Sequence, residues 1–287
     1  MNCRKKGEAV NYRNKRLRGL FGIIFLTAVL ALFCFPKKGG TEHKEYGVFI
    51  GMDREKVLDL KGYHRLVVDA DFLSEEDING LKLKNKEVWS YFNIGSAEAF
   101  RKIDADLQNI RLGKYENWDE DWIDITDEGW KKYLLDKAAE LEKKGIDGFF
   151  IDNTDIYDKD TRIEVYQSIL QILARIAKQK KPIIINGGDC FIKEAMEKND
   201  LQDIVFGINQ ETVFTKIDFK NGRFLENEEQ DKFYYQNYLE KCRDFGLHVF
   251  LIEYGPDEET EKQIRKYCLK KGFTLYVTSS IELDREE

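Results

Sequence analysis

Histidine is scarce in this 287-residue chain, and its scarcity excludes much metal chemistry. The three histidines, His43, His64 and His248, include no two at the spacing of a metal-ligand pair. The five cysteines form no Cys-x-x-Cys pair, so neither a zinc cluster nor a disulfide framework is indicated. The chain also lacks a phosphate-binding P-loop and a Gly-x-Ser-x-Gly nucleophile elbow. We therefore expect no metal site and no cofactor.

Basic residues are also scarce outside the N-terminus. Residues 1–40 carry nine Lys and Arg residues against one acid, Glu8, which is a charge of +8. The whole chain carries −7, which leaves −15 for residues 41–287. Nucleic-acid phosphates demand a basic surface, so we expect no nucleic-acid partner. An acidic body would instead suit a cationic ligand.

The chain has only one long apolar run, near its N-terminus. Seven basic residues precede the 17-residue run Gly19–Phe35, and Pro36 follows it. This length is the lower limit for crossing a bilayer core, and the preceding positive charge predicts a cytoplasmic N-terminus and an exported body. We expect a cytoplasmic segment at 1–18, a membrane anchor at 19–36, with residues 19–35 in the membrane, and a linker at 37–45. The alternative is a cleaved signal peptide and secretion, but the small-x-small cleavage pattern is missing.

The remaining residues, 46–287, alternate between short apolar runs and amphipathic helical patterns. Most of the runs are continuous, as expected for parallel strands buried on both faces. The clearest helical pattern is Arg162–Ala177, and Gly145, Gly246 and Gly272 are helix-stop signals. Eight such strands in one domain predict an α/β fold, a (β/α)₈ TIM barrel, with a doubly wound open sheet as the rival fold. The eight runs are Tyr46–Ile50, Arg65–Ala70, Val88–Asn93, Gly148–Asp152, Ile183–Asn186, Ile204–Asn209, Val249–Glu253 and Thr274–Thr278.

Polar side chains stand at the carboxyl ends of nearly all these predicted strands, where TIM barrels carry their chemistry. Two acids, Asp152 and Glu253, end continuous apolar strands, and we expect them to be catalytic. Paired carboxylates perform acid and base catalysis, and glycoside hydrolysis is a common example. The residues that we expect to bind substrate are Asp69, Asn93, Glu98, Trp118, Asp155, Asn186, Glu211 and Tyr254.

Several of these positions also have a structural reading. Asp155, Asp189 and Ser96 could each cap the helix that follows, and Asp69 could be a buried ion-pairing residue. Trp118 lies in the long excursion 113–124, where aromatic rings could stack on sugars or plug the top of the barrel.

Four segments resemble, in order, the signature segments of glycoside hydrolase family 114. They are YFNIGSAEAFR (Tyr91–Arg101), NWDEDWIDIT (Asn117–Thr126), GIDGFFIDNTDIY (Gly145–Tyr157) and IEYG (Ile252–Gly255). The resemblance covers residues 46–280 and implies a TIM-barrel endo-α-1,4-polygalactosaminidase. It places Asp152 and Glu253 at the family's catalytic acids and Glu98, Asp155, Glu211 and Tyr254 around its groove. One departure is Ser96, where the family usually has the first glutamate of Gly-Glu-Ala-Glu.

The leading hypothesis is an extracytoplasmic, membrane-tethered, endo-acting glycosidase that cleaves an amino-sugar polysaccharide with a pair of carboxylates. The alternative is a non-catalytic, cell-surface, carbohydrate-binding TIM barrel. Either carboxylate could be the acid, with the other as nucleophile or base. We expect the protein to be a monomer.

Overall fold

A computed structural model describes residues 44–101, 105–115 and 117–287. The predicted cytoplasmic segment and membrane anchor lie outside these described residues. So does the predicted linker, except for its last two residues. Within the described part of the chain, no helix is both long enough and apolar enough to cross a membrane.

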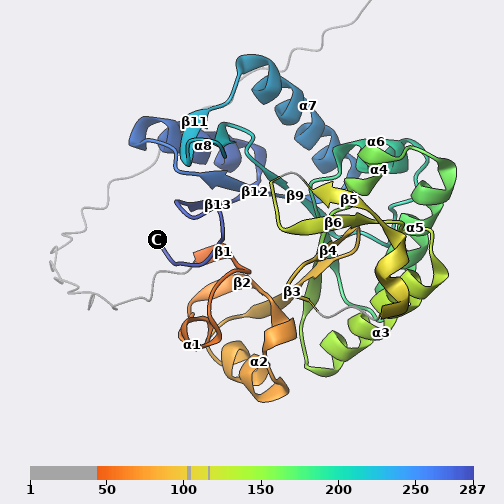
Figure 1. The fold of residues 1–287 in the computed structure, drawn as a ribbon. Coiled ribbons are helices and arrows are strands. Elements are labelled where there is room, and N and C mark those ends of the chain that lie inside the picture. The colour runs from red at the N-terminus through yellow and green to blue at the C-terminus, as the bar shows by residue number, and fades with distance from the viewer. Residues whose placement is uncertain (1–43, 102–104, 116) are drawn as a thin grey trace, which may run out of the picture. The chain divides into compact units, whose positions relative to one another are not determined.

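Eight parallel strands form a nearly closed barrel, in which each strand is hydrogen-bonded to its neighbours in chain order (Figure 1). This arrangement confirms the predicted (β/α)₈ barrel and not the rival fold, a doubly wound open sheet. The strand predicted at Ile204–Asn209 begins later, at Gly207. The residues before it form turns, in which the Val205 backbone nitrogen donates to the Leu201 carbonyl oxygen. The strands are β1 (Lys44–Phe49), β2 (Tyr63–Val68), β3 (Glu87–Asn93), β7 (Gly148–Asp152), β8 (Ile183–Asn186), β9 (Gly207–Glu211), β12 (His248–Tyr254) and β13 (Thr274–Thr278).

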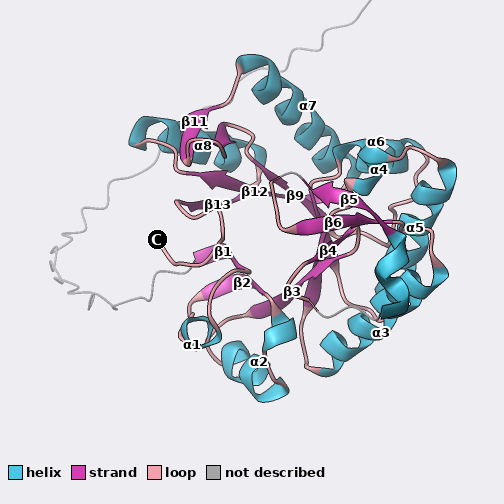
Figure 2. Cartoon of the chain, in the orientation of Figure 1, coloured by secondary structure: helices cyan, strands magenta, loops and turns pink. Residues whose placement is uncertain are grey.

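Helices surround the sheet and cover its outer face (Figure 2). The helical pattern predicted at 162–177 is α5, which buries Ile169, Ile172 and Ile176 on the face that packs against the barrel. Gly246 and Gly272 end their helices in the left-handed conformation, as predicted from sequence. The helices are α1 (Arg54–Val57), α2 (Glu75–Lys82), α3 (Glu128–Lys143), α4 (Ile156–Lys159), α5 (Ile163–Ala177), α6 (Asp189–Glu197), α7 (Glu229–Phe245) and α8 (Glu258–Lys271).

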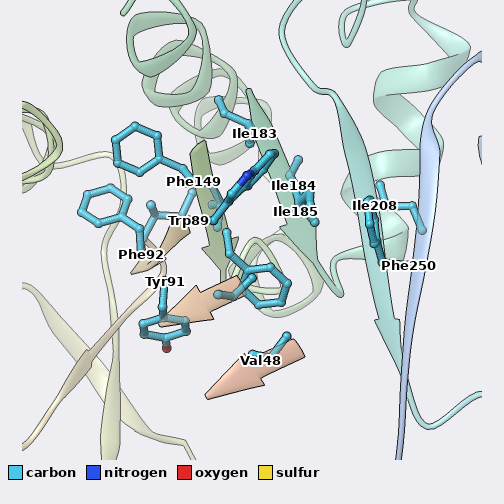
Figure 3. Packing of buried hydrophobic residues seen from close by; sticks show 14 of the residues in the cluster. Val48, Trp89, Tyr91, Phe92, Phe149, Ile183, Ile184, Ile185, Ile208 and Phe250 are labelled. Carbon is cyan, nitrogen blue, oxygen red and sulfur yellow. The ribbon is translucent and has the colours of Figure 1, made fainter. Parts of the chain in front are cut away.

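The core lies on both faces of the barrel strands, which explains their continuous apolar sequences. Trp89, Phe149 and Ile184 are at most 1% exposed (Figure 3). At the carboxyl ends of the strands the apolar side chains give way to polar ones. The packed barrel therefore acts as a rigid base for these polar groups.

Two antiparallel excursions extend from the carboxyl end of the barrel. The first follows β3 and contains β4 (Ser96–Glu98), the 3₁₀ helix η2 (Ala105–Ile110), β5 (Arg111–Tyr115) and β6 (Glu120–Ile123). The second is the hairpin of β10 (Thr215–Asp218) and β11 (Arg223–Glu226), which follows β9. A short 3₁₀ helix, η1 (Ala70–Phe72), follows β2. These segments supply most of the walls above the barrel mouth.

The C-terminal segment lies beside the seam between β1 and β13. No hydrogen-bonded ladder joins these two strands in the described structure. Glu286 instead accepts hydrogen bonds from Lys44 at 2.6 Å and from the Tyr63 hydroxyl at 2.7 Å. A Cβ at Gly51 would lie 2.1 Å from the Glu282 carbonyl oxygen, so only glycine permits this close approach. The segment therefore connects the last strand with the first two.

Candidate active site

A cavity of about 800 Å³ opens at the carboxyl ends of the barrel strands. Eight of the ten predicted site residues line it, and Asn93 and Glu253 do not. Residues from both excursions and from the C-terminal segment complete its walls. The eight lining residues are Asp69, Glu98, Trp118, Asp152, Asp155, Asn186, Glu211 and Tyr254.

Two of these acids are joined by a single amide. The Asn186 side-chain nitrogen, at the end of β8, donates to Asp152 at 3.0 Å and to Glu211 at 2.8 Å. Asp152 ends β7 and Glu211 ends β9, so Asn186 stands on the strand between them. Asn209 donates to the Asn186 carbonyl oxygen at 2.7 Å, which fixes the direction in which the bridging amide points. The barrel therefore holds two carboxylates side by side over its mouth.

Two tyrosines complete the hydrogen bonding of this carboxylate pair. The Tyr91 hydroxyl donates to Asp152 at 3.1 Å, and the Tyr254 hydroxyl donates to Glu211 at 2.6 Å. Burial, together with the charge of Glu211, raises the pKa of Tyr254 well above its ordinary value. The phenol therefore stays protonated and acts as a permanent donor. Each carboxylate thus has one oxygen on the shared amide and one on its own tyrosine.

The environment of the pair opposes ionisation of both acids at the same time. Burial raises the pKa of Asp152 to about 8, and the negative charges of Glu211 and Asp155 act in the same direction. Two interacting carboxyl groups lose their protons as a pair. Near neutral pH the site therefore starts with one proton available, which is what a two-carboxylate hydrolase needs.

Glu253 lies elsewhere, and this corrects the expectation that it faces Asp152. Its side chain is completely buried and accepts hydrogen bonds from the backbone nitrogens of Val213, Phe214 and Thr215, at 2.9–3.2 Å. The Thr215 hydroxyl donates a further bond at 2.7 Å. Successive side chains on a strand point to opposite faces, so Tyr254 faces the cavity and Glu253 points away from it. Glu253 therefore holds the segment between β9 and β10.

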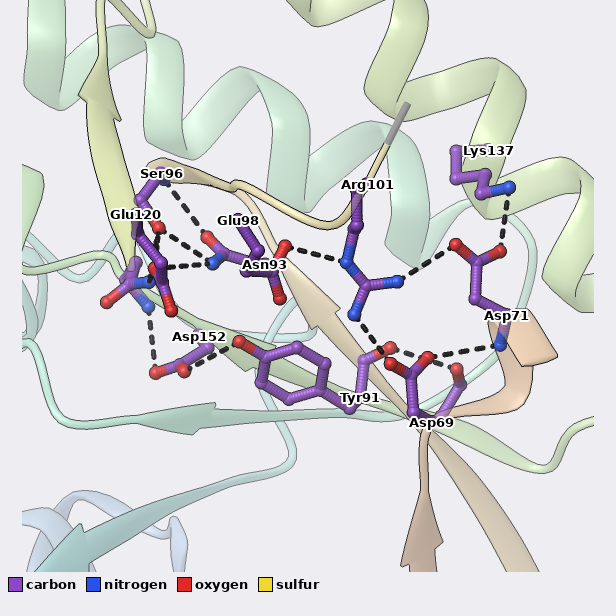
Figure 4. Close-up of polar contacts among 12 residues, drawn as sticks. Asp69, Asp71, Tyr91, Asn93, Ser96, Glu98, Arg101, Glu120, Lys137 and Asp152 are labelled. Carbon is purple, nitrogen blue, oxygen red and sulfur yellow. Dashed lines mark hydrogen bonds and ion pairs between the residues drawn. The ribbon is translucent and has the colours of Figure 1, made fainter. Parts of the chain in front are cut away.

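Asn93 also lies outside the cavity, in a polar cluster beneath the first excursion (Figure 4). The Ser96 hydroxyl accepts from Asn93 at 2.7 Å and from Asn153 at 2.8 Å, and it donates to Glu120 on β6. Ser96 therefore connects three elements and does not cap a helix. Glu120, which sequence reasoning missed, brings a carboxylate to the cavity wall beside Ser96.

Arg101 was also missed by the sequence analysis. It joins three acids on the side of Tyr91 that faces away from Asp152 (Figure 4). Its guanidinium contacts Asp69 at 2.6 Å, Asp71 at 2.9 Å and Glu98 at 2.7 Å. Burial raises the pKa values of Asp69 and Glu98, and Arg101 opposes this effect. Both readings of Asp69 are therefore compatible with the structure, since it lines the cavity and is also a largely buried ion-pair partner.

Asp155 and Asp189 have different environments. Asp155 lines the cavity and accepts a hydrogen bond from the Gly188 backbone nitrogen at 3.0 Å, and burial raises its pKa to about 6. Its side chain makes no capping bond to α4. Asp189 lies outside the cavity with Asp158 and Cys190, a group with metal-ligand spacing. Lys193 contacts Asp189 at 2.8 Å, so an internal cation already partners this acid.

The two tryptophans of the first excursion behave differently. Trp122 is buried and stacks on Tyr115 with ring centroids 4.2 Å apart, so it packs the top of the barrel. Trp118 lines the cavity, and its ring meets Phe219 of the β10–β11 hairpin edge to face at 5.7 Å. Trp122 therefore packs the top of the barrel, whereas Trp118 is placed where a bound ligand could reach it.

A TIM barrel with bridged carboxylates in an open cavity is the architecture of a glycoside hydrolase. The glycoside-hydrolase family GH114 model matches residues 59–285, and the chain belongs to this family. The protein is thus a glycoside hydrolase, as predicted from the signature segments. No curated protein sequence matches the chain.

Solved structures show the same fold. The glycoside hydrolase domain of PelA from Pseudomonas aeruginosa is 19% identical, with a TM-score of 0.68 over 84% of this chain and 96% of that one. Ega3 from Aspergillus fumigatus, in complex with galactosamine, is 16% identical, with a TM-score of 0.64 over 84% and 93%. An α-galactosidase from Thermus thermophilus is 11% identical, with a TM-score of 0.55 over 83% and 58%.

Replacement of Glu253 tests its structural role. Glu253→Gln should lower the free energy of unfolding by about 2 kcal/mol or more, because the new amide places a donor against backbone N–H groups. Urea unfolding measures this change. The control Glu258→Gln changes an exposed side chain on α8 and should stay within ~0.5 kcal/mol of the wild type. An equally stable Glu253→Gln protein would contradict the role as a loop anchor.

The raised pKa of Asp152 makes stability depend on pH. A carboxyl group whose folded pKa exceeds its unfolded value, ~3.9, contributes stability below that value and loses it as pH rises through about 8. Asp152→Asn cannot ionise. The free energy of unfolding of the wild type should therefore fall relative to that of the variant as the pH is raised from about 5 to about 8.5. The difference between the two proteins should change by more than ~1 kcal/mol.

Urea unfolding at both pH values measures this difference. Asp53→Asn is the matched control, since the Asp53 side chain is 77% exposed and lies outside the cavity. Its stability should follow that of the wild type at both pH values. Parallel curves for Asp152→Asn and the wild type would show that Asp152 ionises normally.

Proposed function

We propose that the protein is an endo-acting hydrolase of an amino-sugar polysaccharide, an α-1,4-linked galactosamine-type polymer, and that Asp152 and Glu211 are its catalytic pair. The observation that carries this proposal is the Asn186 amide, which donates to both carboxylates. Glu211 thus takes the role expected for Glu253. The resemblance of the chain to Ega3, solved with galactosamine, supports the sugar class.

In this proposal one carboxyl group protonates the leaving glycosidic oxygen, while the other attacks the anomeric carbon or activates a water molecule. The raised pKa of Asp152 supports a pair that retains one proton near neutral pH. Tyr91 and Tyr254 donate to the outer oxygens of the pair. They hold both carboxylates in place as charge moves between them.

The charge of the cavity supports a cationic substrate. Eight carboxylate residues and only two basic residues line it, which leaves a formal charge of −6. A polymer with free amino groups is a polycation at neutral pH, and a cavity of the opposite sign attracts it. Trp118 would stack on a sugar ring beside the catalytic pair. The acids are Asp69, Glu98, Asp119, Glu120, Asp152, Asp155, Glu211 and Glu282, and the bases are Arg101 and Lys216.

Activity of two conservative variants tests the catalytic pair. Asp152→Asn and Glu211→Gln should each lower kcat on deacetylated α-1,4-galactosamine polymer roughly a thousandfold or more, because each removes one group of the pair. Reducing-end release measures cleavage. Glu258→Gln, an exposed α8 variant, should keep wild-type turnover. Near-normal turnover in either pair variant would overturn the assignment, and polymer binding without cleavage by the wild type would favour the carbohydrate-binding alternative.

We also propose that the barrel is extracytoplasmic and tethered to the membrane through residues 19–35, with secretion after signal cleavage as the alternative. Seven basic residues precede this run and only two, Lys37 and Lys38, directly follow it, and this bias supports export. Protease added to intact cells should degrade residues 46–287 and spare an epitope tag at the N-terminus. A barrel that is protected until the cells are lysed would contradict this topology.

A further inference from the structure

Two phenylalanines outside the catalytic pair form an exposed aromatic platform at the rim of the cavity. Phe72 lies in η1 and is 58% exposed, and Phe100 follows β4 and is 66% exposed. Their ring centroids are 6.1 Å apart. Large aromatic side chains are usually buried, so two exposed neighbouring rings beside a binding cavity indicate a contact surface.

The platform is held in place by a buried cation. The Arg101 guanidinium lies 5.6 Å from the Phe72 ring centroid and 5.1 Å from that of Phe100. Arg101 is itself fixed by three ion pairs, to Asp69, Asp71 and Glu98, and its side chain is only 15% exposed. The inner parts of the rings therefore rest on a guanidinium that is fixed by its ion pairs, while their outer parts face solvent. A preordered aromatic surface loses little conformational entropy when a ligand binds.

The platform is continuous with the proposed substrate site. Phe100, Asp69, Glu98 and Arg101 all line the same cavity as the catalytic pair. Phe72 follows β2, whereas Phe219, the partner of Trp118, follows β9. These strands are four positions apart in the eight-stranded order, so Phe72 and Phe219 extend from opposite sides of the barrel mouth. A chain that crosses the mouth past Asp152 and Glu211 would meet one group at each end.

We propose that Phe72 and Phe100 form a distal sugar-binding subsite, which stacks on a pyranose ring of the polymer beyond the two rings joined by the cleaved bond. This inference rests on the proposed function and adds a preference for long chains to it. The ligand is the carbon–hydrogen face of a sugar ring, since the Asp69 and Glu98 carboxylates beneath the platform are already paired with Arg101. Binding energy at this distance would hold the polymer across the catalytic pair.

The test compares substrates of increasing length. The double variant Phe72→Ala/Phe100→Ala should raise KM for deacetylated α-1,4-galactosamine polymer about tenfold, because stacking on an aromatic surface is lost, and should leave kcat nearly unchanged. For the shortest oligosaccharides that are cleaved, KM should equal the wild-type value, since they do not reach the platform. Phe100→Trp should retain the low KM for polymer.

The matched control is Leu83→Ala/Leu269→Ala, which removes two exposed apolar side chains outside the cavity. It should keep wild-type KM for every chain length. A double phenylalanine variant with wild-type KM for polymer would overturn the subsite while leaving the proposed function intact. An equal rise in KM for all lengths would also overturn it, since the defect would then lie at the catalytic end. A wild-type protein that cleaves none of these polymers would overturn the proposed function, and the subsite with it.

Discussion

The arrangement of the site depends on one amide nitrogen, that of Asn186, which donates to Asp152 and to Glu211 at 3.0 and 2.8 Å. This contact is possible because parallel strands bring their carboxyl ends to the same rim, and because β8 stands between β7 and β9. Two carboxylates held this close repel each other when both are ionised. The shared amide and the tyrosine donors reduce that repulsion, and burial keeps a proton on the pair.

The site is acidic, yet three of its acids form ion pairs with one internal arginine. Arg101 ties Asp69, Asp71 and Glu98 together, so these three acids do not act as a free anionic patch. The ring of Tyr91 lies 5.8 Å from the Arg101 guanidinium, and its hydroxyl reaches Asp152. One side chain thus contacts both the Arg101 cation and Asp152 of the proposed catalytic pair (Figure 4). Asp152 and Glu211 form hydrogen bonds but, within the described part of the chain, no ion pair with a basic side chain. They therefore remain able to face a cationic polymer.

Glu253 is a buried carboxyl group near the proposed catalytic pair, and the contacts of its side chain are with a loop segment rather than with the cavity. Its side-chain oxygens accept hydrogen bonds from three consecutive backbone N–H groups and a threonine hydroxyl, directly after the strand that ends in Glu211. A carboxylate removed from water needs such partners, because an unpaired one would cost several kcal/mol. By holding this segment, Glu253 sets the base of the β10–β11 hairpin, whose Phe219 meets Trp118 across the cavity.

Local sequence patterns determined the barrel, its acidic body and the placement of polar groups at the strand ends, because strand burial and helix stops are encoded within a few residues. They also determined Asp152, which ends a continuous apolar strand. Only the tertiary structure decided which glutamate faces it. Glu211 is the last residue of β9 and Glu253 the last but one of β12, but side chains alternate between faces, and Tyr254 takes the cavity-facing position on β12. The roles of Arg101, Glu120 and the Phe72–Phe100 platform were likewise decided by long-range contacts between excursions, whose spacing along the chain contains no periodic signal.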